Sequence, residues 1–159
     1  TATPIQMAAA LSSVVNGGTY YQPHLIDKYV NKNGSQTDVK PKIIKQNVVS
    51  KSTTEAIIPL MQYVVDNHTF NPKFDQSRYT VGGKTGTAQI AKPGGGYYDD
   101  QFNGTYAGFV GGDNPDYVIV VFVYKPTIKG YAGSAAAQPI FGSLAHMLID
   151  NSYVNPKGQ

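Results

Sequence analysis

The sequence predicts an α/β domain of the α+β type, in which an antiparallel sheet of about three strands is packed by helices. Three β-prone segments, residues 81–91, 105–112 and 116–125, follow one another with short turns between them, as in an antiparallel meander. Helical patterns with start signals lie before and after these segments. With 159 residues, 41% apolar and 14% charged, the chain has the composition of one folded domain.

The first helix is expected to begin directly after Thr3. Pro4 suits the first helical position, and Gln6 stands three residues after Thr3, which together make a capping box. Apolar residues then recur at three- and four-residue spacing, and Asn16-Gly17-Gly18 supplies a left-handed stop. This helix should bury one face.

Two elements are expected between this helix and the sheet. Short β-prone runs around residues 29–30 and 43–44 lie on either side of the turn signal Asn33-Gly34, and they predict a small exposed ribbon. A second capping box, Ser52 with Glu55, predicts a helix that ends near residues 66–67.

The end of the chain should return to the sheet. Residues 116–125 are apolar at nearly every position, which predicts a strand buried on both faces. Ser134 is expected to cap the last helix, and Pro139 lies close enough to its first turn to be tolerated. One apolar stripe should pack on the sheet: Ile140, Leu144, Met147 and Leu148.

Composition and spacing exclude several kinds of function. The net charge of +3 comes from lysines scattered singly, which indicates a solvated surface and no nucleic-acid-binding stripe. No apolar run approaches the roughly 20 residues of a membrane span. The chain has no cysteine, and His24, His68 and His146 fall in separate elements without a partner four residues away. No metal site and no cofactor is predicted.

The stretch "YTVGGKTGTAQIAKPGGGYY", residues 79–98, carries the strongest chemical signal. Gly83-Lys84-Thr85 matches the end of the phosphate-binding motif G-x-x-x-x-G-K-[ST], but Arg78 stands where that motif requires glycine. The residues after the lysine also favour a strand, whereas the motif requires a helix. The string resembles instead the K-T-G element of serine acyltransferases that act on penicillins and peptidoglycan stem peptides.

A lysine among glycines and threonines on an edge strand has a specific use. Gly86 leaves one face of the strand open, so an extended peptide can pair with it. Hydroxyls at Thr85 and Thr87 can donate to a carboxylate, while Lys84 contributes positive charge. A backbone N–H of the same strand can point at a developing oxyanion. The alternative is a buried strand with an incidental surface lysine.

Beyond this motif, the chain resembles the C-terminal part of the transpeptidase domain of a class B penicillin-binding protein, over residues 1 to about 150 except residues 32–48 and the glycine-rich loop, which have no specific match. "TATPIQMAAALSSVVNGGTYYQPHLI" is similar to a helix of that family and the segment after it, and "GGKTGTAQ" to its third motif. "NGTYAGFVGGDNPDYVIVVFV" resembles its next two strands, and "GSAAAQPIF" the start of its last helix. The implied fold is that of penicillin-binding transpeptidases and serine β-lactamases. Class A enzymes and class D β-lactamases also carry K-T-G, but T-P-I-Q-M-A and A-A-x-P-I-F are more similar to the class B pattern.

The resemblance implies acyl transfer through a serine. In the family the serine attacks the D-alanyl-D-alanine bond of a stem peptide, D-alanine leaves, and an amine of a neighbouring strand takes the acyl group. Lys84 and Thr87 are the implied catalytic residues: Lys84 acts on the serine–lysine network and attracts the terminal carboxylate, and the Thr87 amide forms half of the oxyanion hole. Thr85, Gly86 and Thr87 are the implied substrate-binding residues. β-Lactams would occupy the same groove.

Two motifs of the family are missing from the chain. No serine has a lysine three residues later or an asparagine two residues later, so S-x-x-K and S-x-N do not occur. In the family both lie upstream of the segment that begins at Thr1. Residues 1–159 are therefore expected to be the C-terminal portion of a transpeptidase domain, inactive without the serine half. The alternative function is a non-catalytic penicillin-recognising sensor or scaffold module.

Further expectations concern location and partners. The implied whole protein lies outside the cytoplasm, on the periplasmic or cell-wall face, and is anchored by an N-terminal membrane helix. Stem peptides, β-lactam antibiotics and the missing half of the domain are its implied partners. The strand at residues 118–125 is central in the family's sheet, so an uncovered edge there predicts self-association or binding of the missing half.

The residues after the motif strand have weaker implications. The loop Gly94-Gly95-Gly96 is a candidate gate beside the groove. Tyr97-Tyr98 is a candidate lining for a glycan groove or, alternatively, packs at a loop edge. Asp99-Asp100 is expected to be a solvated pair of turn residues.

Overall fold

The centre of the molecule is a three-stranded antiparallel sheet in the order β5-β6-β7. The computed structural model describes residues 2–159. Its strands are β5 (Thr80–Ala91), β6 (Tyr97–Gly111) and β7 (Pro115–Tyr124). In the register of the sheet, Lys84 lies opposite Ala107. The predicted α+β class and the three-stranded meander are confirmed.

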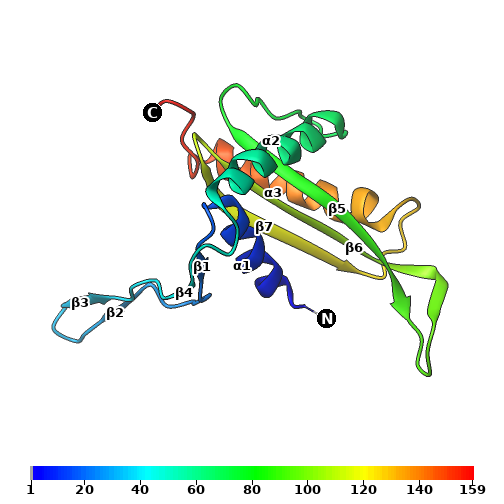
Figure 1. Cartoon of the computed structure of the whole chain (residues 1–159), viewed down its shortest axis with the longest axis horizontal. Helices are drawn as coiled ribbons and strands as arrows, with labels where there is room; N and C mark the ends of the chain where they lie inside the picture. The colour runs from blue at the N-terminus through cyan, green and yellow to red at the C-terminus, as the bar shows by residue number, and fades with distance from the viewer. Residues whose placement is uncertain (1) are drawn as a thin grey trace.

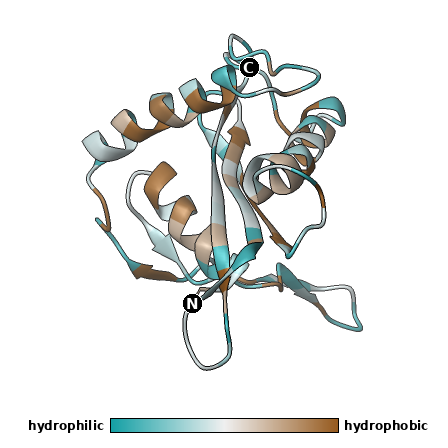
Figure 2. Cartoon of the chain, turned by 90° about the vertical axis from the view of Figure 1, so that its right-hand side faces the viewer, coloured by the Kyte–Doolittle hydropathy of each residue, from teal (hydrophilic) through white to brown (hydrophobic). Residues whose placement is uncertain are grey.

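Helices cover both faces of this sheet. In Figure 1, α1 (Pro4–Val15) and α2 (Lys51–Asn67) lie in front of the strands and α3 (Gln138–Asp150) behind them. Figure 2 shows the strands between the helices from the side. α1 packs against β7, α2 against β5, and α3 against β6 and β7. Within residues 2–159, no helix combines the length and the apolar character that crossing a membrane requires.

The start of α1 agrees with the prediction in detail. The N–H of Thr3 donates to Oε1 of Gln6 at 2.8 Å, and the N–H of Gln6 donates to Oγ1 of Thr3 at 3.3 Å. Asn16 is the C-cap, and Gly17 follows with φ of +89°, a conformation that favours glycine. Local sequence signals are sufficient to define this helix.

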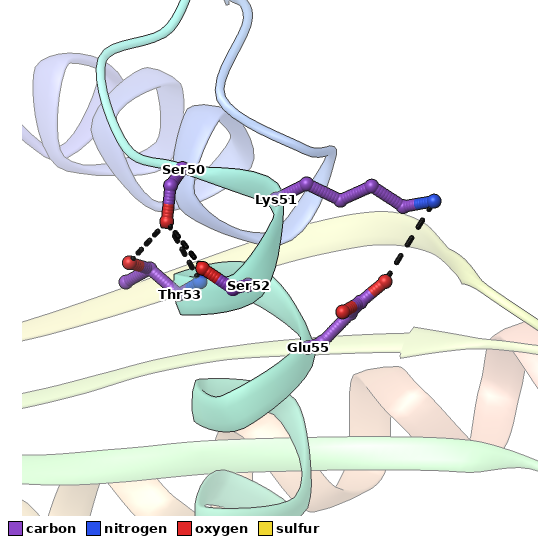
Figure 3. A network of polar contacts seen from close by, with 5 residues as sticks. All are labelled: Ser50, Lys51, Ser52, Thr53 and Glu55. Carbon is purple, nitrogen blue, oxygen red and sulfur yellow. Dashed lines mark hydrogen bonds and ion pairs between the residues drawn. The ribbon is translucent and has the colours of Figure 1, made fainter.

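The start of α2 differs from the prediction by two residues. Its N-cap is Ser50, not Ser52, and the Ser50 hydroxyl accepts the N–H of Thr53 at 3.1 Å (Figure 3). Glu55 therefore does not complete a capping box and instead pairs with Lys51 at 3.7 Å on an exposed surface. Such an exposed pair contributes little to stability.

The start of the last helix also differs from the prediction. Ser134 lies within a short π-helix, η1 (Gly133–Ala137), and is not the cap of α3. The N-cap is Ala137, which makes no side-chain cap hydrogen bond. Pro139 falls in the first turn, as expected. Because α3 continues directly from another helical segment, its first N–H groups need no side-chain cap.

The face of α3 that packs on the core agrees with the prediction only in part: of the predicted stripe, Leu148 packs against the buried cluster. Phe141, Gly142 and Ala145 are buried, and an added Cβ at Gly142 would lie 2.9 Å from the Phe70 ring. Larger apolar side chains of the predicted stripe are partly exposed: Ile140 at 45%, Leu144 at 39% and Met147 at 43%. The prediction of this helix face was based on hydropathy and did not include the small buried residues Gly142 and Ala145.

An aromatic cluster joins the sheet to α3. The rings of Tyr106 and Phe141 are stacked with centroids 4.4 Å apart, and both side chains are fully buried. Phe70, from the loop after α2, meets each of them edge-on at 6.2 Å. Val81 and Val110 complete the fully buried set on this face of the sheet. Apolar burial of this kind is the main stabilising contribution to the fold.

Between α1 and α2 the chain forms an extended arm, residues 22–47, that projects from the body (Figure 1). The predicted ribbon is present, but with different partners. β2 (Lys28–Val30) pairs with β3 (Gln36–Asp38) across the Asn33-Gly34 turn, whereas β4 (Ile43–Lys45) pairs with β1 (Tyr20–Tyr21). The turn brings together the segments nearest to it because a short loop has a smaller closure entropy.

The arm is solvated along its length and holds the net charge of the chain. Residues 21–38 are all exposed. The arm contains five of the 13 basic residues and two of the 10 acidic ones. The net charge of +3 is therefore that of the arm, and charges in the rest of the chain balance.

The prediction that β7 is buried on both faces is wrong for this chain. Val121 is buried, with 7% of its surface exposed, whereas Phe122 is 48% and Tyr124 66% exposed. Among the described strands, β7 pairs with β6 alone. Hydropathy does not distinguish an apolar edge strand from a central one, so the sequence pattern was ambiguous.

We propose that this edge makes the chain self-associate, because its unpaired N–H and C=O groups and exposed apolar side chains favour pairing with a second copy. The average mass from light scattering should rise with concentration, and hydrogen exchange of residues 118–123 should slow. Phe122→Lys should weaken the association, since a charge on an edge strand opposes pairing. A monomer at every concentration, with fast exchange at these amides, would contradict the proposal.

Candidate functional site

The outer edge of β5 carries backbone groups that pair with no other described strand. Val81 shows which residues face this edge: its N–H donates to Gln76 Oε1 at 3.1 Å, and its carbonyl oxygen accepts from Gln76 Nε2 at 2.6 Å. Outward-facing residues alternate along an antiparallel strand, and the register with β6 is unbroken from Thr80 to Gln89. The N–H and C=O groups of residues 83, 85 and 87 therefore point outward. Gly83 is buried, whereas residues 84–89 are exposed or partly exposed. Residues 84–89 of β5 are called the open edge below.

Lys84 places a positive charge beside the open edge. Its side chain is exposed, and Nζ donates to the carbonyl oxygen and to Oγ1 of Thr85, both at 3.2 Å. Within residues 2–159 the ion pair of Lys51 with Glu55 is the one salt bridge. The Lys84 ammonium therefore has no carboxylate partner in the described chain, and its charge remains available for an anionic group.

The side chains of Thr85 and Thr87 lie on the other face of the strand from that of Lys84, because side chains alternate along a strand. Oγ1 of Thr87 accepts the N–H of Gly133 at 3.0 Å, which joins the strand to the start of η1. The Thr87 hydroxyl proton remains free to donate. Between the two threonines, Gly86 is open: an added Cβ would come no closer than 3.6 Å to another residue's atoms, the nearest being Thr105.

A hollow of about 570 Å³ adjoins the open edge. It is lined by Thr87, Gln89 and Phe102 together with residues 130–132. The loop before η1 forms its wall by passing very close to the sheet. An added Cβ at Gly133 would lie 2.5 Å from the carbonyl oxygen of Gly86, so only glycine permits this approach.

Tyr106 supports the open edge from beneath. An added Cβ at Gly83 would overlap the Tyr106 ring. The Tyr106 hydroxyl is buried and has no hydrogen-bond partner among residues 2–159, and burial raises the pKa of this phenol. The phenol therefore stays protonated, and its ring serves as a packing surface for the strand.

Comparison with known proteins identifies the family. The sequence profile described as "Penicillin binding protein transpeptidase domain" matches residues 1–146. This chain belongs to that family. Stage V sporulation protein D of Bacillus subtilis is 35% identical over 156 residues, which are 98% of this chain and 24% of that protein. The chain thus spans about a quarter of the length of that relative, and the resemblance inferred from the sequence is confirmed.

Solved structures of the family agree with this assignment. Penicillin binding protein 3 of Mycobacterium tuberculosis, in its apo form, superposes with a TM-score of 0.78 and 30% identity. The match covers 98% of this chain and 36% of that one. Its complex with aztreonam gives the same TM-score and identity, and its complex with ampicillin gives 0.78 at 29% identity.

In this penicillin-binding transpeptidase chain, the hairpin between β5 and β6 lies next to the open edge. Gly94, Gly95 and Gly96 all have positive φ, and the N–H of Lys92 donates to the carbonyl oxygen of Gly96 at 3.0 Å. The side chain of Tyr97 is 59% exposed. Asp99-Asp100 is exposed, as expected, but lies in strand β6 and not in a turn, because β6 begins at Tyr97. No cluster of metal-ligating side chains occurs among the described residues. A gating role for the glycine loop stays a prediction.

Two residues of the site were not found by sequence reasoning. Gln76 lies in the loop before β5, and Gly133 opens the π-helix far along the chain. Neither belongs to the K-T-G string. Their proximity to the open edge arises from tertiary structure, for which the sequence offers no periodic or motif signal.

Two glycine substitutions in β5 should differ in their effect on stability. Gly83→Ala forces a methyl group into the Tyr106 ring, and overpacking of this kind lowers the free energy of unfolding by about 1–3 kcal/mol. Gly86→Ala is the matched control, because its methyl group has space and alanine is favoured over glycine in strands. Urea unfolding of both variants measures the difference. Equal losses of stability would contradict the packing of Tyr106 against Gly83.

Proposed function

We propose that this chain is the part of a peptidoglycan D,D-transpeptidase that supplies the K-T-G strand and one wall of the catalytic groove. The observation that carries the proposal is the open edge of β5, where the outward N–H of Thr87 and the unpaired ammonium of Lys84 occur together. An extended peptide can pair with such an edge, and membership of the transpeptidase family supports acyl transfer as the reaction.

In the proposed reaction, a serine oxygen attacks the carbonyl carbon of the penultimate D-alanine. The negative oxygen that forms accepts a hydrogen bond from the N–H of Thr87, which lowers the barrier. The C–N bond then breaks, D-alanine leaves with the proton on its nitrogen, and the acyl group stays on the serine as an ester. An amine of a second stem peptide attacks this ester and releases the serine.

The remaining residues of the strand hold the substrate. Lys84 attracts the terminal carboxylate and stabilises the serine–lysine network. The hydroxyls of Thr85 and Thr87 donate to that carboxylate, and Gly86 leaves room for the peptide. The aztreonam and ampicillin complexes of the Mycobacterium tuberculosis relative support the proposal that β-lactams occupy the same groove.

The serine itself is proposed to come from another segment of a longer protein. No serine of the 159 residues is followed by lysine three positions later, and the chain spans 24% of its Bacillus subtilis relative. Residues 1–159 then form the C-terminal portion of the domain, and the missing half is its partner. We place the whole protein outside the cytoplasm, where peptidoglycan is cross-linked, with its membrane anchor in another segment.

The absence of an S-x-x-K serine from the 159 residues also favours a second candidate function. A protein that lacks the S-x-x-K serine altogether would be a non-catalytic penicillin-recognising sensor or scaffold module. Reading the gene upstream of Thr1 distinguishes the two, since an S-x-x-K motif there supports the enzyme and its absence supports the scaffold.

Removing the lysine should slow acylation of the intact protein. Lys84→Ala is expected to reduce the rate of labelling by a fluorescent penicillin by about 10²-fold or more, the usual effect of losing a preorganised charged group. Lys28→Ala in the arm is the matched control and should label at the wild-type rate. If Lys84→Ala were labelled at the wild-type rate, with thermal unfolding unchanged, the proposed role of Lys84 in acylation would be contradicted.

The chain alone should not react with penicillin. No serine in it has the neighbouring lysine that activates the nucleophile. After incubation with a fluorescent penicillin, a denaturing gel should show a labelled band for the intact protein and none for residues 1–159. A band that survives denaturation in the isolated chain would contradict the proposal.

A further inference from the structure

We infer that Asn33, in the turn at the end of the arm, modifies itself by closing a ring with the backbone of Gly34, and so becomes aspartate or isoaspartate. The chain contains three Asn-Gly pairs: Asn16-Gly17, Asn33-Gly34 and Asn103-Gly104. Glycine has no Cβ, so the backbone nitrogen after each asparagine is unobstructed. Because the three pairs share this local chemistry, the surrounding structure decides which of them reacts.

The reaction requires water as its only co-reactant. The Gly34 nitrogen gives its proton to solvent and attacks Cγ of Asn33, which forms a C–N bond and places negative charge on Oδ1. The bond from Cγ to Nδ2 then breaks, and Nδ2 leaves as ammonia with a proton taken from solvent. Water opens the resulting cyclic imide at one of its two carbonyl carbons. Opening at Cγ gives aspartate, and opening at the main-chain carbonyl carbon gives isoaspartate.

The turn leaves the pair at position 33 free to react. Residues 22–38 are exposed, and the pair lies between β2 and β3 at the end of the projecting arm (Figure 1). No atom lies within 4 Å of the position that a Cβ on Gly34 would take. The N–H of Gly34 donates to the carbonyl oxygen of Asn31 at 2.9 Å. Such a bond in an exposed turn opens at little cost in free energy, which releases the nitrogen for attack.

Ser35 favours the attack on Cγ. Its N–H donates to Oδ1 of Asn33 at 3.0 Å, and its hydroxyl donates to the same oxygen at 2.7 Å. Negative charge develops on this oxygen when the ring closes, and donors that are already in place stabilise it. The arm also carries five basic and two acidic residues, and its net positive charge favours the anionic intermediate.

The pair at the end of α1 is restrained by its side chain. Nδ2 of Asn16 donates to the carbonyl oxygen of Thr19 at 2.8 Å, and Oδ1 accepts the N–H of Thr19 at 2.9 Å. Both atoms of the amide group are therefore bonded to one backbone segment. The nitrogen cannot leave as ammonia without breaking the first of these hydrogen bonds, so this pair should react more slowly.

The pair in β6 is restrained by the sheet. Gly104 is buried and lies opposite Thr87 of β5 and Val123 of β7. An added Cβ at Gly104 would lie 2.2 Å from the carbonyl oxygen of Ala132, so the backbone has no room to move on that side. Ring closure at Asn103 would require the central strand to open, and core strands have the highest opening free energies.

Conversion at position 33 changes the arm and leaves the body as it is. The new carboxylate lowers the net charge of the arm from +3, five basic minus two acidic residues, to +2. Isoaspartate also adds a carbon to the main chain of the turn, next to the pairing of Val30 with Gln36. Residues 22–38 contribute no buried side chain. The modification is therefore a slow, irreversible change of charge that is confined to the arm.

The test follows the three pairs in one sample. The intact protein is incubated in water enriched in ¹⁸O, digested, and analysed by mass spectrometry, since hydrolysis of the imide places solvent oxygen in the product. Asn33 should be converted at least about tenfold faster than Asn16 and Asn103, and faster at higher pH because the attacking nitrogen must lose its proton. In urea the three rates should approach one another, because unfolding removes the restraints on the two slow pairs.

Two variants in the arm test the proposed attack. Gly34→Ala should slow conversion at least about tenfold, because a methyl group obstructs the attacking nitrogen. The matched control Gln36→Ala, which leaves the pair unchanged, should react at the wild-type rate. Conversion of Asn33 in the folded protein that is no faster than at the other pairs would overturn the inference, and so would an unchanged rate in Gly34→Ala. Rates that still differ tenfold in urea would show that the fold is not the cause.

Discussion

The packing of the Tyr106 ring between Phe141 and the backbone of Gly83 is the contact on which the rest of the structure depends. The ring sets the distance between the sheet and α3, and it requires glycine at position 83, where any side chain would overlap it. Since Lys84 is the next residue, the same contact fixes the position of the chemically important part of β5. One face of β5 is thus packed against the Tyr106 ring, while its outer edge pairs with no other described strand. The proposed binding of a peptide to this edge requires both properties, because a mobile strand would have to be ordered each time a peptide paired with it.

Much of the fold could be predicted because its signals are local. Thr3 and Gln6 cap α1 through contacts within one turn, so the sequence alone is sufficient. The start of α2 could not be chosen in this way, since Ser50 and Ser52 have the same capping chemistry. A distant contact helps to fix α2 in place, the hydrogen bond from Thr54 Oγ1 to the Val14 carbonyl at 2.6 Å. The buried face of α3 was predicted only in part for a related reason: small buried residues such as Gly142 carry no hydropathy signal.

The candidate site likewise contains residues that the local sequence predicts and residues that only the fold brings together. The K-T-G string is contiguous, so residue types and strand alternation predict an exposed lysine on a strand, as the structure has it; the catalytic role of Lys84 stays a prediction. The groups that limit and support this string come from elsewhere in the chain. Gly133 reaches Thr87 across 46 positions of sequence, and Lys157 reaches Gln76 across 81. Contacts of this range follow from the completed fold, and a single sequence contains no pattern that announces them.

The arm between α1 and α2 divides the molecule into parts under different constraints. Its residues 22–38 are exposed and add nothing to the buried core, so substitutions, insertions and deletions there should leave the sheet and the open edge folded as before. Because the arm also holds the whole net charge, substitutions in it can change the isoelectric point of the chain while the open edge stays the same. The arm is therefore the region of this chain where changes of sequence and charge are least constrained by the buried core.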